Sequence, residues 1–151
     1  MPNDPIPRPD LTLRPFDTHA ERTVAHAPSI VYAAWTTGFD RWFAAPGAIW
    51  MTPAEGAPFV FVVQHEGARH PHYGRFLRLD PDRVVSLTWV SSGTGGVETV
   101  VTVELEPDAH GTRVRLTHEG FPDAASRDRH AEAWPKVLEQ MDGRLGHSQG
   151  G

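Results

Sequence analysis

The sequence contains no cysteine, a single lysine and no long run of apolar residues. Without cysteine the chain cannot form a disulfide bond, a thiolate zinc site or a cysteine nucleophile. No stretch approaches the ~18 consecutive apolar residues that a membrane-spanning helix needs. The first ten residues are polar and proline-rich, and they lack the apolar centre of a signal peptide. These absences favour a cytoplasmic protein with no membrane span.

Positive charge is also scarce. The chain has 19 acidic and 14 basic residues, and its formal net charge is -5 at pH 7. Nonspecific nucleic-acid binding needs a basic face that displaces counterions, so this balance argues against a nucleic-acid partner. Arg75, Arg78 and Arg83 lie close together in the sequence, but solvated arginines on a sheet face account for them.

The two ends of the chain differ from its middle. Five prolines among residues 1–15 prevent regular pairing, so we expect a flexible N-terminal tail there. Residues 16–146 are expected to form one domain, since a chain of this length buries a sizeable core without staples. Residues 147–151 are expected to form a flexible C-terminal tail.

The longest helix is predicted from Asp123 to Leu145. Its apolar residues are spaced by three and four positions and so form one stripe on one face, namely Trp134, Val137, Leu138, Met141 and Leu145. Pro135 lies inside this pattern, where it removes a backbone donor and crowds the carbonyl of Ala131, at a cost of ~3 kcal/mol. We therefore expect either a bend or the start of a new helix near Pro135.

The preceding chain is predicted to form one strand, two short helices and a run of further strands. The first strand covers residues 16–26, and the helices cover 30–37 and 39–43. The later strands are expected at residues 48–51, 59–65, 73–79, 84–90, 97–106 and 112–118. Strands separated by such short turns pair as antiparallel neighbours. The fold class is therefore α+β, with a curved antiparallel sheet of six or seven strands under the long C-terminal helix.

Several short segments carry a family resemblance through their order in the chain. They are residues 31–36, 41–43, 72–76, 87–89, 98–103, 111–113 and 116–118, followed by Trp134, Pro135 and Leu138. This ordered set resembles the START-like superfamily, also called Bet v 1-like or SRPBCC, and within it the family related to the C-terminal domain of the Hsp90 ATPase activator Aha1. The resemblance implies a helix-grip fold with a pocket between sheet and helix. Because the superfamily includes carriers, receptors, cyclases and co-chaperones, the fold does not fix the function.

Three histidines suggest a metal site at first sight. His65, His70 and His72 lie within eight positions and would face one another across a hairpin, as zinc ligands do. Gly67 and Pro71, however, mark a solvent-facing turn. We therefore expect solvated histidines and assign neither a metal nor a cofactor.

A candidate acid–base group consists of His118, Glu119 and Glu98. A buried histidine beside a carboxylate titrates near neutral pH, which suits proton transfer. His118 nevertheless ends a strand whose inward side chains are Val114 and Leu116, and this favours a histidine that is hydrogen-bonded to a backbone carbonyl. We assign no catalytic residue. A cyclase- or hydrolase-type enzyme that uses His118 and nearby acids stays as an alternative function.

The aromatic residues are the best guide to function, because ligand pockets are mostly apolar with a few placed polar groups. The same rings would also serve as plain core packing. We expect a small hydrophobic or aromatic ligand between sheet and terminal helix, bound by Trp35, Trp42, Phe43, Phe61, Tyr73, Trp89, His118, Trp134 and Leu138. Gln64 and Arg75 are further polar candidates. A co-chaperone-like interaction domain is the other alternative, and a homodimer or a chaperone partner stays open.

Overall fold

The computed structural model describes residues 8–45 and 47–149. The outer parts of the two predicted tails, residues 1–7 and 150–151, lie outside the described residues. In chain order the elements are β1 (Phe16–Val24), α1 (Pro28–Ala34), the 3-10 helix η1 (Phe39–Arg41), β2 (Ile49–Met51), β3 (Pro58–His65), β4 (Ala68–Asp80), β5 (Val84–Trp89), the 3-10 helix η2 (Ser92–Thr94), β6 (Thr99–Asp108), β7 (Gly111–Phe121) and α2 (Ala124–Gln149). In this described part, no helix is long and apolar enough to cross a membrane.

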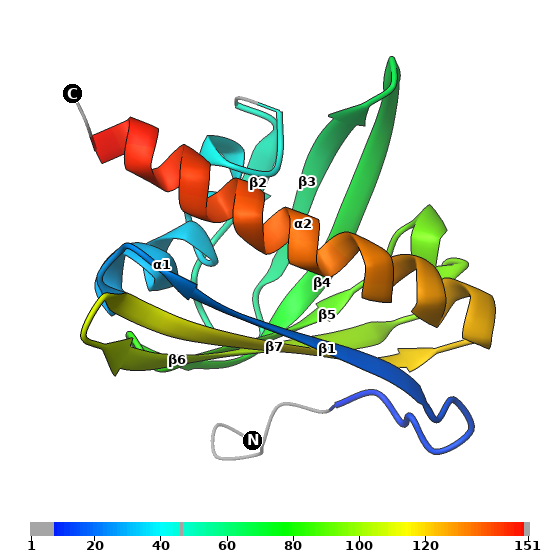
Figure 1. The fold of residues 1–151 in the computed structure, drawn as a ribbon. Coiled ribbons are helices and arrows are strands. Elements are labelled where there is room, and N and C mark those ends of the chain that lie inside the picture. The colour runs from blue at the N-terminus through cyan, green and yellow to red at the C-terminus, as the bar shows by residue number, and fades with distance from the viewer. Residues whose placement is uncertain (1–7, 46, 150–151) are drawn as a thin grey trace.

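The strands form one seven-stranded antiparallel sheet with the order β1-β7-β6-β5-β4-β3-β2. From β2 to β7 each strand pairs with its neighbour in the sequence, because short connections leave no other partner within reach. The first strand returns to pair with the last. The sheet is curved, and α2 crosses its concave face (Figure 1). The predicted α+β class and sheet architecture are therefore confirmed.

The long helix holds to the sheet through its predicted apolar stripe. Trp134, Leu138, Met141 and Leu145 are each at most 3% exposed, and Val137 is partly buried beside them. Burial of one large apolar side chain contributes about 1.5–3 kcal/mol. Four such residues therefore provide the main attraction between helix and sheet.

The helix runs unbroken through Pro135, so the predicted alternative of a new helix starting there is wrong. Pro135 itself is exposed, while Trp134 and Leu138 on either side are buried. The burial of these neighbours offsets the cost of the lost backbone hydrogen bond. Tertiary packing thus overrides the local preference of proline.

Strand β4 is longer than predicted, because it begins at Ala68 and not at Tyr73. The turn before it is confined to Glu66 and Gly67, which both have positive φ angles, as in two-residue hairpins. Pro71 therefore lies inside the strand and not in a turn. It is tolerated because β4 pairs with β5 only from Phe76 onward, preceded by a single bridge from Tyr73 to Val90, which leaves Pro71 on an edge.

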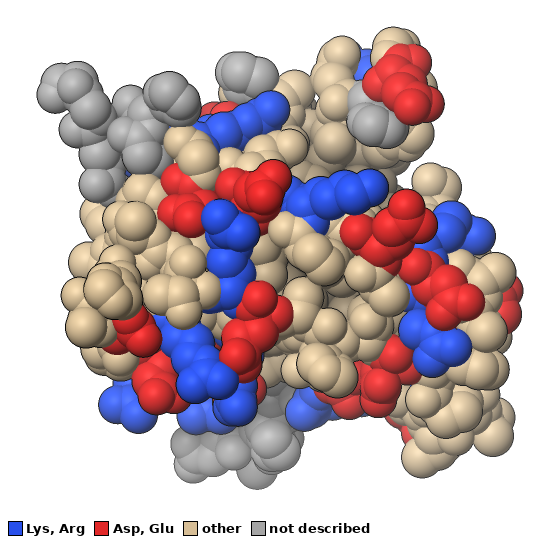
Figure 2. Space-filling view, in the orientation of Figure 1, with Lys and Arg blue, Asp and Glu red and all other residues tan. Residues whose placement is uncertain are grey.

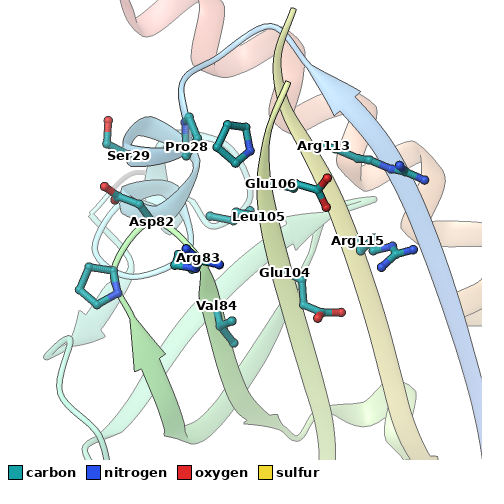
Figure 3. A pocket seen from close by; sticks show the side chains of 12 residues that line it. Pro28, Ser29, Asp82, Arg83, Val84, Glu104, Leu105, Glu106, Arg113 and Arg115 are labelled. Carbon is teal, nitrogen blue, oxygen red and sulfur yellow. The ribbon is translucent and has the colours of Figure 1, made fainter. Parts of the chain in front are cut away.

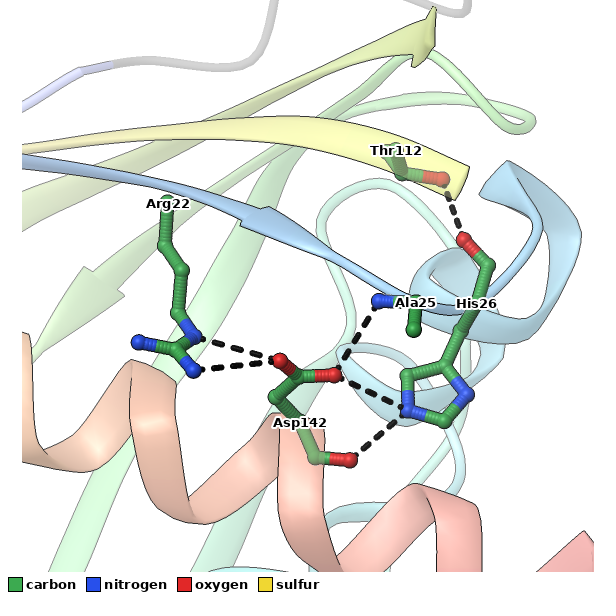
Figure 4. Close-up of polar contacts among 5 residues, drawn as sticks. All are labelled: Arg22, Ala25, His26, Thr112 and Asp142. Carbon is green, nitrogen blue, oxygen red and sulfur yellow. Dashed lines mark hydrogen bonds and ion pairs between the residues drawn. The ribbon is translucent and has the colours of Figure 1, made fainter. Parts of the chain in front are cut away.

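A polar cluster around Asp142 fastens the C-terminal half of α2 to the end of β1 (Figure 4). The Asp142 carboxylate accepts hydrogen bonds from Nε of Arg22 at 3.2 Å and from the backbone N–H of Ala25 at 3.1 Å. His26 places its Nε2 2.7 Å from the Asp142 carbonyl oxygen, and the carbonyl of His26 accepts a bond from Thr112. The cluster fixes where the helix crosses the sheet.

At Gly74, strand β4 approaches strand β5 too closely to leave room for a side chain. A Cβ atom at this position would lie 2.2 Å from the carbonyl oxygen of Thr88. Because backbone atoms cannot yield cheaply, we expect Gly74→Ala to lower the free energy of unfolding by about 1–3 kcal/mol in urea titrations. The matched control is Gly143→Ala on α2, where a Cβ would meet nothing within 4 Å. It should raise stability by about 0.5–1 kcal/mol. A neutral Gly74→Ala would contradict the close approach.

Candidate functional site

A groove runs along one side of α2, between that helix, the β3–β4 hairpin and η2. Its volume is about 580 Å³. Phe43, Val63 and Val137 supply partly buried apolar side chains, and the buried residues Trp89 and Trp134 also border the groove. We refer to this space as the groove. The β3–β4 hairpin that borders it rises beside the helix in Figure 1.

The structure places the nine sequence-predicted ligand residues in three environments. Phe43, Trp89 and Trp134 line the groove, as does the further polar candidate Gln64. Five others lie behind it in the core, where each is fully buried, namely Trp35, Trp42, Phe61, His118 and Leu138. The core aromatics pack ring against ring, with centroid distances such as 5.1 Å from Trp35 to Trp42 and 6.2 Å from Trp35 to Trp134. Aromatic side chains therefore fill the inner part of the space between helix and sheet.

Tyr73 is the residue that the structure places away from the groove. Opposed residues of two paired strands share a face. His72 opposes Phe61 and faces the helix, whereas Tyr73 opposes Val60 on the other face and is 47% exposed. Strand alternation thus turns Tyr73 outward, and Arg75, with the same parity, instead pairs with Glu98 at 3.3 Å.

Sequence reasoning missed most polar residues of the groove, and its expectation that His70 and His72 lie in a solvent-facing turn is wrong. His70 and His72 enter it from β4, because that strand continues through Pro71. The helix contributes a second row of side chains, His130, Ala133, Val137, Gln140 and Arg144. These residues are spaced by three and four positions. The last four of them each precede a residue of the buried stripe by one position. That spacing is a sequence signal for a helix flank that borders the core without entering it.

His118 is held in a chain of hydrogen bonds behind the groove. Trp134 donates from Nε1 to Nδ1 of His118 at 3.1 Å, and a Trp nitrogen can only donate. The proton of the neutral ring therefore lies on Nε2, which is 2.7 Å from Oγ1 of Thr99. Thr99 in turn donates to the carbonyl oxygen of Trp89 at 2.6 Å. The chain joins the two tryptophans that border the groove.

Burial keeps His72, His118 and His130 neutral near pH 7. It holds the pKa of His118 well below its ordinary value, with a further contribution from nearby His130. Burial also lowers the pKa of His72 to about 4 and lowers the pKa of His130. These rings therefore act near neutral pH as hydrogen-bonding groups and not as charges.

The arrangement does not assemble the acid–base group considered from the sequence. Both ring nitrogens of His118 are occupied by Trp134 and Thr99. Glu98 is engaged by Arg75 on the outer face. Among the described residues, no cluster of His, Asp or Glu is arranged to hold a metal ion, and the side chain of His65 lies outside them.

A second, larger hollow of about 700 Å³ lies on the outer face of the sheet, beside the turn between β4 and β5 (Figure 3). Its walls carry charges of both signs, from Arg83, Glu104 and Glu106 among others. Its arginines Arg113 and Arg115 are both bound to Glu21, at 2.7 and 2.9 Å. Since two of its three arginines are already paired and its remaining walls carry both signs of charge, the groove beside α2 is the better candidate despite its smaller volume.

A family model described as "Activator of Hsp90 ATPase homolog 1-like protein" matches residues 25–146. The chain belongs to this family. The comparison with curated proteins gives no match.

Solved structures show the same fold. Protein CV1439 from Chromobacterium violaceum superposes with a TM-score of 0.72 at 21% identity, over 87% of this chain and 98% of that chain. Protein MLL2253 from Mesorhizobium loti gives 0.72 at 23% identity, over 88% and 98%. The solution structure of the Aha1 dimer from Colwellia psychrerythraea gives 0.67 at 21% identity, over 85% and 95%.

Two tryptophans provide a matched test of the hydrogen-bond chain. Trp35 and Trp134 are both buried, but Nε1 of Trp35 has no hydrogen-bond partner among the described residues. Trp134→Phe removes a similar volume and also leaves Nδ1 of His118 without its donor. We expect Trp134→Phe to cost about 1–3 kcal/mol more than Trp35→Phe, measured by urea unfolding. Equal losses for the two variants would show that the Trp134–His118 bond contributes nothing.

Stability should depend on pH because the folded protein keeps His72, His118 and His130 neutral. The unfolded chain takes up protons on its histidines below pH ~6.5, so acid favours unfolding. We expect the free energy of unfolding to fall between pH 7 and pH 5, by up to about 1.4 kcal/mol per pH unit for each such ring. His72→Gln should reduce the slope. A free energy that stays constant over this range would refute the assignment of neutral rings.

Proposed function

We propose that the protein binds a small hydrophobic or aromatic molecule in the groove. The observation that carries this proposal is the convergence of three partly buried apolar side chains on one open space. Phe43 comes from the segment after η1, Val63 from β3 and Val137 from α2. Apolar surface that stays open to water between packed elements favours a ligand that covers it.

The size and composition of the groove support the same function. Its volume of about 580 Å³ falls within the range of about 300–1,000 Å³ that small-molecule pockets occupy. Its lining exposes more apolar than polar surface, and polar side chains such as Gln140 and His72 lie among the apolar ones. Binding is favoured over the cyclase or hydrolase alternative, because both ring nitrogens of His118 are engaged in hydrogen bonds within the core.

The test uses a substitution that fills the groove. Ala133 is an exposed helix residue that lines the groove, and Ala131, two positions earlier, is exposed outside it. A tryptophan at position 133 would occupy the space that the ligand needs, whereas one at position 131 would project into solvent. We expect Ala133→Trp to weaken binding of the neutral dye N-phenyl-1-naphthylamine by about tenfold or more, equivalent to about 1.4 kcal/mol. Ala131→Trp should bind it like the parent.

Dye emission is titrated with each protein, and the unfolding midpoint is compared to confirm that both variants are folded. Native mass spectrometry of protein purified from its own host identifies any molecule that remains bound. If the parent does not bind the dye, or if both variants bind it like the parent, the groove is not the site.

A further inference from the structure

The groove has an unusual charge composition for a chain of net charge -5. Its lining, among the described residues, includes Lys136, Arg144 and three histidines but neither aspartate nor glutamate. On the face that Figure 2 shows, acidic and basic side chains are mixed. Cations in a mostly apolar space whose described lining holds no carboxylate favour a negatively charged ligand group.

Arg144 is the cation that the structure positions. Its Nη1 donates to the carbonyl oxygen of Trp42 at 2.9 Å, and Gln140, one turn earlier, donates to the same oxygen at 2.6 Å. This contact uses one of the five N–H donors of the guanidinium group. The nearest carboxylate in the sequence, Asp142, is directed to Arg22 and His26 instead.

Lys136 is placed differently. Its side chain is 76% exposed and lies 3.7 Å from Glu132, an equally exposed partner on the preceding helical turn. Surface pairs of this kind are weak and mobile. Arg144 is therefore the better anchor for an anion.

The polar anchor lies at one end of an apolar path. From His130 to Arg144 the helix advances by fourteen residues, which corresponds to about 21 Å at 1.5 Å per residue. Trp134 and Val137 lie between these ends and face the groove. A ligand that follows the helix therefore meets apolar side chains along its body and the guanidinium group at its end.

We infer that the groove takes an amphipathic anion, a molecule with an apolar or aromatic body and an acidic group, such as a carboxylate or sulfonate, that binds Arg144. This inference rests on the proposed binding function and adds the chemical class of the ligand. Neutral His72 and His130 do not compete with Arg144 for the anion near neutral pH, and they add hydrogen-bonding groups along the path.

Two dyes with the same aromatic skeleton separate charge from apolar contact. 1-Anilinonaphthalene-8-sulfonate carries a sulfonate, and N-phenyl-1-naphthylamine lacks it. Each is titrated with the parent and with Arg144→Gln, Arg144→Lys and Arg78→Gln. Arg78 is the matched control because it is an exposed arginine of β4 that lies outside the groove and pairs with Asp80.

We expect Arg144→Gln to weaken binding of the sulfonate dye by about tenfold while binding of the neutral dye stays at the parent value. Arg144→Lys should restore part of the loss, and Arg78→Gln should leave both dyes unaffected. The loss should shrink as salt rises, because ions screen an exposed charge.

The outcomes distinguish the two proposals. If Ala133→Trp blocks both dyes but Arg144→Gln changes neither, the groove binds ligands and the anion inference is wrong. Equal weakening of both dyes by Arg144→Gln also overturns it, since the arginine would then act by packing. If Ala133→Trp blocks neither dye, the proposed function itself fails, and the inference fails with it.

Discussion

The structure depends on one stripe of α2 that must be buried against a curved sheet. Trp134, Leu138, Met141 and Leu145 meet this requirement, and Asp142 fixes the crossing point near the end of β1. A straight helix cannot follow a curved sheet over its whole width, so one flank of the helix is left partly uncovered. The β3–β4 hairpin borders that flank, and the groove lies between them. The same packing that holds the fold together thus creates the candidate site.

The hydrogen bonds that His118 makes fix the orientation of α2 on the sheet, which apolar contacts alone do not. Hydrophobic burial is largely non-directional, so it would tolerate small rotations of the helix. The bond from Trp134 to His118, continued through Thr99 to the Trp89 carbonyl, is satisfied only in one arrangement of α2 over β5, β6 and β7. Because a buried polar group without a partner is costly, the chain fixes the positions of both tryptophans that border the groove.

Elements that depend on a regular spacing of apolar residues could be predicted from the sequence. Features that depend on contacts with residues far away in the chain could not. The spacing of the stripe and the alternation of the strands identified α2 and the antiparallel sheet. Pro71 was misplaced because its tolerance depends on where β5 stops pairing with β4, and no local pattern records that. Tyr73 was grouped with the pocket by its aromatic character, whereas strand parity turns it outward. Arg144 could not be linked to the site, since its partner Trp42 lies about a hundred residues earlier.

The groove is lined by cations although the chain as a whole carries a negative net charge. A chain with net charge -5 repels anions at a distance, but at physiological salt that field decays within about 8 Å. Inside the groove the charges that matter are those of its own walls, and the described walls include two cations and no carboxylate. Low hydration beside Phe43 and Val137 strengthens their effect on a bound group. Selectivity for an anion can therefore arise at contact range in a protein that is acidic as a whole.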